Sequence, residues 1–212
     1  FARPTHAYMG LSPALDFESK LFAKPNAAQL LEKELAKPGY KVAPIAMGTN
    51  TDPYQPIEQD YRITRSLLEV LSAYNHPVTI LTKSARIVRD IDILSSLAKR
   101  NLVRVALSVT TLDPKLARAL EPRASTPARR IEAIKLLSDA GIPTGAMIAP
   151  VIPALNDMEI EKLLTGVAYA GAAHAHFVIL RLPLDIRPIS VDSLPAPVLH
   201  PATPAMSRIR QM

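Results

Sequence analysis

Apolar runs rich in β-branched residues alternate along the chain with stretches whose apolar residues recur at helical spacing. One run follows another at intervals of roughly 25 to 40 residues, which is typical of successive strand–helix units and of the parallel sheet that such units build. Five strands are predicted, at residues 42–47, 78–82, 103–108, 144–148 and 177–182. The first of them is apolar throughout, so we expect it to be buried on both faces.

Helices are predicted between these strands, because their apolar residues form stripes that suit a core-facing side. The stripes are Leu30, Leu31 and Leu35; Ile63, Leu67, Val70, Leu71 and Tyr74; Ile87, Ile91 and Leu94; Ile131, Ile134 and Leu137; and Ile160, Leu163, Leu164 and Val167. Asn26 and Asn156, each three residues before a Gln or Glu, have the spacing of helix N-caps, and Gly141 and Gly171 stand where C-caps belong.

Polar residues follow the predicted strands. Thr49, Asn50, Thr51 and Asp52 come after the first strand, and Thr82-Lys83-Ser84, Ser108-Val109-Thr110-Thr111 and Ala149-Pro150-Val151-Ile152-Pro153 end the next three. Since the carboxyl ends of parallel strands meet at one edge of a sheet, we expect these groups to converge on one ligand.

Length and composition narrow the possibilities. The 212 residues, 48% of them hydrophobic and 21% charged, suit one α/β domain with a sizeable core. The absence of cysteine excludes disulfides, thiol nucleophiles and any iron–sulfur or cysteine–zinc site built from this chain alone. The five histidines have no metal-binding spacing, so no metal site is predicted. No apolar stretch is long enough to cross a bilayer, and without a signal peptide we expect a cytoplasmic location.

The net charge of +6 favours an anionic partner, such as nucleic acid or a phosphorylated metabolite. The basic residues are spread out, however, and with 5% aromatic residues and no Trp a base-stacking surface is not evident. A basic nucleic-acid-binding domain is therefore a weaker hypothesis than an enzyme.

Two kinds of chemistry suit the predicted strand ends. Lys83 could act as a Schiff-base or general-base lysine with Asp52 as its acid–base partner, in a cofactor-free lyase or aldolase. No second lysine or glutamate is obviously placed beside Lys83, which counts against this reading. Alternatively, the same groups bind a zwitterion and a ribose, with Lys83 on a carboxylate, Asp52 or Thr49 on an ammonium and Ser108 on a hydroxyl.

Several segments together resemble radical S-adenosylmethionine (SAM) proteins, most closely a branch related to spore photoproduct lyase. They are residues 1–8, beginning Phe1-Ala2-Arg3-Pro4; 48–58; 82–84; Leu120-Glu121-Pro122-Arg123; and 141–153. The resemblance covers residues 1 to about 184, which we interpret as the radical SAM core, with 185–212 as an irregular proline-rich tail. It implies an α/β fold, a partial (β/α)6 TIM-like barrel whose first strand is missing.

In that family a C-x-x-x-C-x-Y-C segment directly precedes the residues that Phe1-Ala2-Arg3-Pro4 resemble, and its thiolates hold a 4Fe-4S cluster. The resemblance therefore implies a chain truncated after this motif, which should bind no cluster and be inactive by itself. It also implies reductive cleavage of SAM to a 5′-deoxyadenosyl radical that acts on an unknown substrate, for which nucleic acid is a candidate. An electron donor such as flavodoxin or ferredoxin would be a partner.

The resemblance also assigns roles within the cofactor site. Residues Thr49 to Asp52 would hold the methionyl amine, Lys83 or Arg123 the carboxylate, Ser108 the ribose, and the backbone near Val151 the adenine. No catalytic side chain is predicted.

Overall fold

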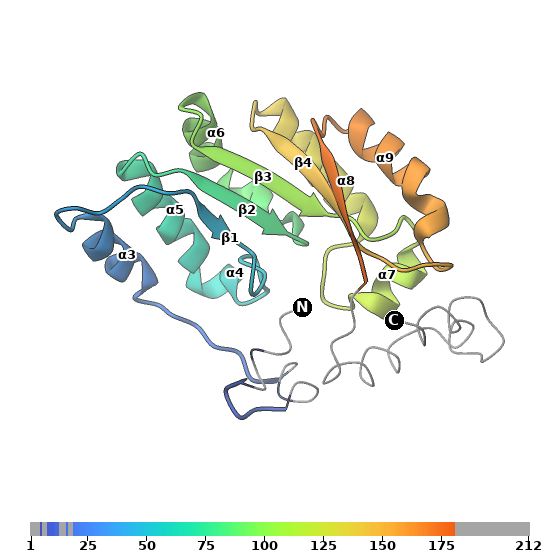
Figure 1. Cartoon of the computed structure of the whole chain (residues 1–212), viewed down its shortest axis with the longest axis horizontal. Coiled ribbons are helices and arrows are strands. Elements are labelled where there is room, and N and C mark those ends of the chain that lie inside the picture. Colours follow the sequence, from blue (N-terminus) through green and yellow to red (C-terminus); the bar gives the residue numbers. More distant parts are fainter. Residues whose placement is uncertain (1–4, 6–7, 13–15, 17–18, 181–212) are drawn as a thin grey trace.

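A computed structural model describes residues 5, 8–12, 16 and 19–180 of the chain. The segment Phe1-Ala2-Arg3-Pro4 and the predicted tail at 185–212 lie outside the described residues. Five strands form one parallel sheet in the sequential order β1-β2-β3-β4-β5, which is the order of a partial TIM-like barrel (Figure 1). They are β1 (Ile45–Met47), β2 (Val78–Thr82), β3 (Val103–Ser108), β4 (Thr144–Val151) and β5 (Ala175–Ile179).

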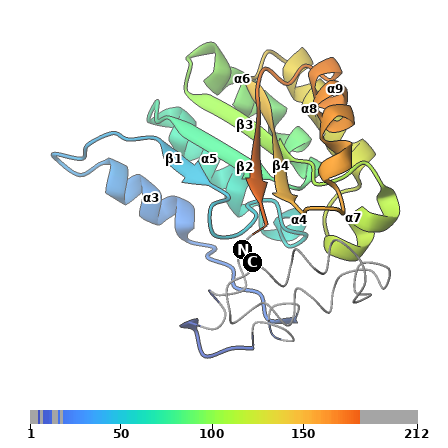
Figure 2. The same ribbon diagram turned by 45° about the vertical axis from the view of Figure 1, so that its right-hand side comes forward.

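Helices precede the first strand and return the chain from each strand to the next. They are α3 (Ala27–Leu35), α4 (Glu58–Tyr61), α5 (Ile63–Ala73), the 3₁₀ segment η1 (Ala85–Asp90), α6 (Ile91–Lys99), α7 (Pro114–Leu120), α8 (Pro127–Asp139), the 3₁₀ segment η2 (Asp157–Glu159) and α9 (Ile160–Tyr169). Helices α5, α6, α8 and α9 form a layer along one face of the twisted sheet (Figures 1 and 2). Every helix within the described residues is too short or too polar to cross a membrane.

The core lies between the sheet and this helical layer. Strand residues such as Ile80 and Leu107 are almost fully buried there, and they meet the apolar stripes that the sequence predicts on the helices. Leu71, Leu94, Ile134, Leu137, Leu163 and Val167 are among the fully buried members of those stripes. Burial of these stripes against the sheet fixes the positions of the strand ends, since each helix is packed through its apolar side.

Four of the five predicted strands agree with the structure to within a few residues, but the prediction for the first strand is wrong in part. Strand β1 begins at Ile45, three residues later than expected, and Val42 is 65% exposed. Pro44 lacks a backbone N–H, so the ladder to β2 begins at Ile45, whose N–H donates to the Pro77 carbonyl. The strand is partly exposed rather than buried on both faces, because β2 is its one neighbour among the described strands.

The predicted helices are all present, whereas two short helices were not predicted. Helices α4 and α7 have four and seven residues, too few to show a periodic stripe. The start of α7 nevertheless has a signal in the sequence: Asp113 caps the Lys115 N–H at 2.7 Å, and Pro114 occupies the first helical position.

Four helices end in the same way, at the edge of the sheet from which the strands start. Asn75, Asn101, Gly141 and Gly171 all adopt positive φ directly after a helix. After α8, for example, the Gly141 N–H donates to Ser138 and the Ile142 N–H to Leu137, the paired bonds of a Schellman motif. The predicted C-caps at Gly141 and Gly171 are thereby confirmed. Asn26 and Asn156 stand at the N-cap positions of α3 and η2, as predicted, but neither side chain makes a capping hydrogen bond.

Backbone strain at a non-glycine residue also occurs on the opposite edge. Ala154, in the turn between β4 and α9, is exposed and has a φ of 63°. Because its side chain makes this conformation unfavourable, we expect Ala154→Gly to raise the free energy of unfolding by about 1 kcal/mol. The measurement is urea unfolding. Ala173→Gly is the control: Ala173 is exposed without positive φ, and glycine there should lower the free energy by up to about 1 kcal/mol. Equal effects of the two changes would contradict the assignment of strain.

Candidate functional site

Side chains from two strand ends converge on one backbone carbonyl of a third. The Ala149 carbonyl, in β4, accepts from Lys83 Nζ at 3.3 Å, from Ser108 Oγ at 3.3 Å and from Thr110 Oγ1 at 3.0 Å. Lys83 directly follows β2, Ser108 ends β3 and Thr110 comes two residues later. A carbonyl oxygen has two lone pairs and a hydroxyl has one proton, so Ala149 can accept from Lys83 and Ser108 while Thr110 donates to another acceptor. The ends of β2, β3 and β4 are therefore joined through one carbonyl.

A glutamate lies beside these donors. Glu121, just after α7, forms an ion pair with Lys83 through Oε1, which also accepts from Thr110 Oγ1 at 2.9 Å. Its Oε2 accepts from Arg130 Nη2 at 2.6 Å. We call Lys83, Ser108, Thr110, Glu121 and Arg130 the rim cluster. Two cations and one carboxylate give it a net charge of +1.

Arg130 is the most buried member of the rim cluster that carries a charge. Its side chain is 2% exposed, and it also donates to the Ser108 carbonyl at 2.8 Å and to the Ser125 carbonyl at 2.7 Å. These bonds hold the guanidinium between the end of β3 and the start of α8, so that Glu121 has a fixed partner.

Glu121 stays ionised in this setting. Burial by itself would raise the pKa of the carboxyl, but the charges of Lys83 and Arg130 outweigh it and lower the pKa below its ordinary value of 4.5. Because the folded-state pKa is lowered, the ion pairs stabilise the fold above the unfolded pKa. That contribution is lost as the pH falls through the folded value.

The sequence argument against a partner for Lys83 is wrong, because Glu121 is that partner. The pairing was missed since 38 residues separate the two, and α7 brings them together. The only signal lay in Leu120-Glu121-Pro122-Arg123, one of the segments that carry the family resemblance. Thr110 was expected at this edge with the other residues that end the third strand, although no role was assigned to it. Arg130 was not predicted, and periodicity offers no means of finding it.

Asp52 ties the end of β1 to the end of β2. Its Oδ1 accepts from the Tyr54 N–H at 2.8 Å and from Thr82 Oγ1 at 2.7 Å, and its Oδ2 accepts from the Lys83 N–H at 2.8 Å. Both carboxylate oxygens are therefore engaged within the protein. The structure thus brings Asp52 to the same edge as Lys83 and Ser108, where its carboxylate links two strand ends through hydrogen bonds.

The other predicted site residues lie around this edge. Thr49, Asn50 and Thr51 are exposed; Asn50 Oδ1 accepts from Thr5 Oγ1 at 2.6 Å, and Thr51 Oγ1 from Gln55 Nε2 at 2.6 Å. Arg123 is exposed in the loop between α7 and α8. Val151 is buried at the end of β4, and its carbonyl accepts from the Leu180 N–H at 2.9 Å. Their roles in binding a cofactor stay predictions.

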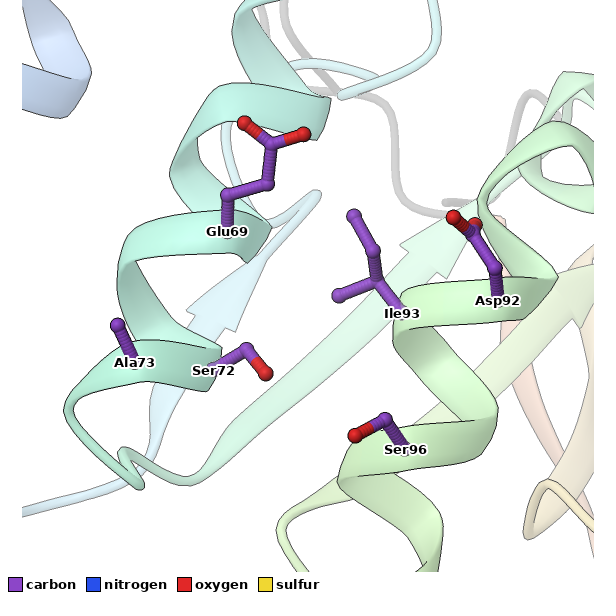
Figure 3. A pocket seen from close by; sticks show the side chains of 6 residues that line it. All are labelled: Glu69, Ser72, Ala73, Asp92, Ile93 and Ser96. Carbon is purple, nitrogen blue, oxygen red and sulfur yellow. The ribbon is translucent and has the colours of Figure 1, made fainter.

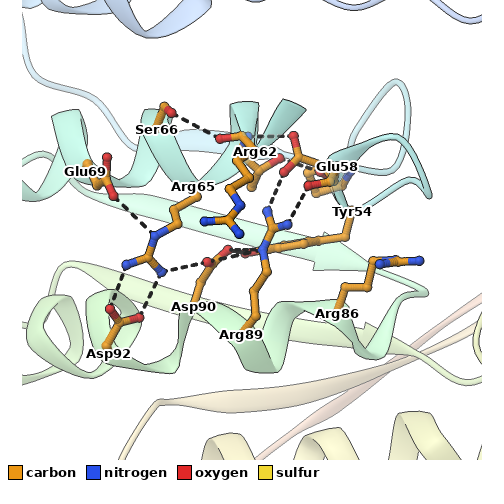
Figure 4. Close-up of polar contacts among 12 residues, drawn as sticks. Tyr54, Glu58, Arg62, Arg65, Ser66, Glu69, Arg86, Arg89, Asp90 and Asp92 are labelled. Atoms are coloured by element: carbon orange, nitrogen blue, oxygen red, sulfur yellow. Dashed lines mark hydrogen bonds and ion pairs between the residues drawn. The ribbon is translucent and has the colours of Figure 1, made fainter. Parts of the chain in front are cut away.

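A second polar network anchors the loop that carries Asp52 (Figure 4). Tyr54 Oη donates to Asp90 Oδ2 at 3.0 Å, and Arg65 Nη1 donates to the other oxygen of Asp90 at 3.0 Å. Arg89 Nη2 pairs with Glu58 Oε2 at 2.5 Å. Burial, followed by the nearby Asp90 carboxylate, raises the pKa of Tyr54, so the phenol remains a donor. The network joins the loop after β1 to η1 and α5.

The loop after β4 is braced against the end of β3. Asn156 Oδ1 accepts from the Ile152 N–H at 2.6 Å, and its Nδ2 donates to the Thr110 carbonyl at 2.7 Å. Glu159 Oε2 accepts from Thr111 Oγ1 at 2.8 Å and from the Leu112 N–H at 2.7 Å. These bonds explain why Asn156 does not cap a helix: its amide spans two loops instead.

Hollows elsewhere on the molecule lie away from the rim cluster. One of about 410 Å³ separates α5 from α6 and is lined by Glu69, Ser72, Ala73, Asp92, Ile93 and Ser96 (Figure 3). Another of about 190 Å³ lies near Tyr40 and His76. Among the described residues, no group of three or more His, Cys, Asp or Glu side chains is placed to hold a metal ion.

Comparisons with known proteins found a matching family model and several relatives. The model of the Radical SAM superfamily matches residues 24–165, which include the whole rim cluster. An uncharacterized protein of Mycobacterium tuberculosis is 38% identical over 174 residues, which are 81% of this chain and 51% of that protein. An uncharacterized protein of Methanocaldococcus jannaschii is 35% identical over 115 residues, 54% of this chain and 43% of that protein. The chain thus spans about half the length of these relatives.

Solved structures show a similar fold. A mutant of spore photoproduct lyase aligns with a TM-score of 0.57 at 17% identity, covering 84% of this chain and 51% of that one. Streptococcus suis SuiB bound to its precursor peptide SuiA aligns with a TM-score of 0.54 at 20% identity, covering 74% of this chain and 33% of that one.

Gly48 allows the loop with Asp52 to leave β1 close to β2. An added Cβ would lie 2.0 Å from the Leu81 carbonyl oxygen, and the φ of Gly48 is 97°. We therefore expect Gly48→Ala to lower the free energy of unfolding by about 3 kcal/mol or more, measured in urea. Gly39→Ala is the control, because Gly39 has a φ of 84° and open space around its Cα. Its loss should be about 1 kcal/mol, from the backbone conformation alone. Equal losses would show that the contact with Leu81 is unimportant.

Proposed function

The chain belongs to the radical SAM superfamily, and from this membership we propose that the rim cluster and the loops beside it bind S-adenosylmethionine in a radical enzyme. Members of the superfamily use SAM together with a 4Fe-4S cluster, and they need a reductant and a substrate. The assignment of the site to these residues of this chain is our proposal.

The observation that carries the proposal is the charge of the rim cluster at the strand ends. Lys83 and Arg130 share one carboxylate, that of Glu121, so the members of the cluster leave one positive charge. Lys83 Nζ has three N–H donors, and its contacts with Glu121 and Ala149 account for two of them. The carboxylate of SAM would supply both a counter-charge and a further acceptor.

We assign the roles as follows. Lys83 binds the carboxylate of SAM and Ser108 a ribose hydroxyl, while the backbone near Val151 contacts the adenine. The loop at Thr49 to Asp52 faces the methionyl amine through Thr49, Asn50 and Thr51, because both oxygens of Asp52 are already occupied. Arg123, exposed in the loop after α7, extends the positive charge of the carboxylate subsite outward.

The chain's residues suit SAM but not the cluster. Cluster ligands in proteins are chiefly cysteine thiolates, and the chain has no cysteine. We propose that the thiolates come from outside these 212 residues, and we derive no step through the cluster. When bound, the cluster supplies the reductive cleavage of SAM, which yields a 5′-deoxyadenosyl radical.

The cofactor-free lyase is disfavoured by the same contacts. A Schiff-base lysine must reach its carbonyl substrate as a neutral amine, whereas Lys83 is ion-paired with Glu121 as an ammonium. Asp52 has no free oxygen with which to transfer a proton. The pair that this hypothesis needs is thus engaged in holding the strand ends.

The partners proposed for the full-length enzyme are anionic. Lys115, Arg118 and Arg129 are exposed on α7 and α8, whose adjoining loops also supply Glu121 and Arg123. Exposed cations beside a site raise the encounter rate with acidic partners. They suit an electron donor such as flavodoxin or ferredoxin, and nucleic acid remains a candidate substrate.

Binding of S-adenosylhomocysteine to the chain tests the site without the cluster. We expect Lys83→Gln and Ser108→Ala to weaken binding in equilibrium dialysis by about tenfold or more, through loss of a charge-assisted and a neutral hydrogen bond respectively. Lys99→Gln, an exposed lysine on α6, is the control and should bind as the wild type does. Absence of binding by the wild type, or unchanged binding by both site variants, would reject the proposed site.

Cleavage of SAM tests the origin of the cluster. After anaerobic reconstitution with iron and sulfide, the chain alone should form no 5′-deoxyadenosine, because it offers no thiolates. A longer form with cysteines from the same gene should form it under the same conditions with dithionite. Formation of 5′-deoxyadenosine by the chain alone would contradict the proposal.

A further inference from the structure

We propose that Glu121 determines which anion the rim cluster accepts, so that the site takes a singly charged carboxylate and rejects a doubly charged phosphate. This inference rests on the proposed function and names the selectivity of the same site. Any site that binds SAM in a cell must discriminate against adenine nucleotides, because they share both the base and the ribose of SAM.

The charges of the cluster carry the inference. Lys83 and Arg130 contribute two positive charges and Glu121 one negative charge, and Glu121 is in direct contact with both cations. One positive charge is left for a ligand. A carboxylate neutralises it, whereas the terminal phosphate of a nucleotide, with close to two negative charges at neutral pH, leaves an excess of negative charge.

Because the cluster is buried, this difference in charge has a large effect on the free energy of binding. The side chain of Arg130 is 2% exposed and that of Glu121 is 11% exposed, so charge left over in the cluster is poorly screened by solvent. In such surroundings a like charge a few Å away costs far more than it does in water. The carboxylate of Glu121 would lie beside the second charge of a bound phosphate.

Glu121 cannot readily move aside to admit the larger charge. Its two oxygens accept hydrogen bonds from Lys83, Thr110 Oγ1 and Arg130. Arg130 in turn donates to two backbone carbonyls, which hold its guanidinium in place. Nor does protonation remove the repulsion at neutral pH, because its cationic neighbours keep Glu121 ionised. The negative charge therefore persists when a ligand arrives.

The test compares S-adenosylhomocysteine with ADP, whose terminal phosphate lies at a similar number of bonds from the ribose C5′ as the amino-acid carboxylate. Dissociation constants of both are measured for the wild-type chain, Glu121→Gln and the control Glu132→Gln. Glu132 is exposed on α8, and its replacement makes the same change in overall charge. We expect Glu121→Gln to shift the ratio of the two constants toward ADP by about tenfold or more, and Glu132→Gln to leave it unchanged.

A double variant restores the charge by another route. Lys83→Gln combined with Glu121→Gln leaves Arg130 as the single charge of the cluster, again +1. Both ligands should bind more weakly than they do to the wild type, but their ratio should return toward the wild-type value. A merely structural role for Glu121 would weaken both ligands alike and leave the ratio unchanged in every variant, which would overturn the inference.

A measurement on the wild type covers the case in which Glu121→Gln does not fold. Adenosine 5′-phosphosulfate carries a singly charged sulfate where ADP carries its terminal phosphate, and we expect it to bind about tenfold more tightly than ADP. Equal binding of the two would overturn the inference while leaving the proposed function intact, provided that S-adenosylhomocysteine binds. Absence of binding by S-adenosylhomocysteine would instead remove the proposed function, and this inference with it.

Discussion

Carboxylates that bridge neighbouring strand ends are the interaction on which this structure depends. Where a parallel strand stops, its last N–H groups lose their ladder partners and need other acceptors. Asp52 supplies them between β1 and β2, and Glu159 supplies them after β3, while Glu121 joins side chains from the ends of β2 and β3. Each carboxylate belongs to one loop and receives donors from another. The loops at this edge are thus fixed relative to one another before any ligand binds.

These hydrogen bonds explain why the candidate site is defined by its contacts rather than by a surface hollow. The hollow between α5 and α6 is lined by ordinary surface residues, and Glu69 and Asp92 on its wall are paired with Arg65. The rim cluster instead combines buried side chains with an excess positive charge. Those features bear on binding, because an anionic ligand can balance that charge.

The sequence predicted the strands and the main helices because burial against one core gives periodic patterns. It also predicted that Asp52, Lys83 and Ser108 share one edge, which follows from parallel strand order alone. It could not predict that Glu121 and Arg130 meet, since this depends on where α7 and α8 lie relative to the strand ends. Charged residues that pair across 38 positions give no local sequence pattern from which the pair could be predicted. For the same reason the role of Asn156 could not be predicted: it has the spacing of a capping residue, yet its side chain joins two loops in the folded chain.

The uniform helix endings after α5, α6, α8 and α9 have a consequence for how such a fold can diversify. After each of them an Asn or Gly in the left-handed conformation leads the chain back to the sheet. The same pair of backbone hydrogen bonds closes each helix, and no side chain takes part in these bonds. These endings lie at the edge from which the strands start, away from the rim cluster. Insertions or exchanges in the loops at the other edge can then alter what is bound without shifting the strands. The segments that determine folding and those that determine binding are thus separate within each strand–helix unit.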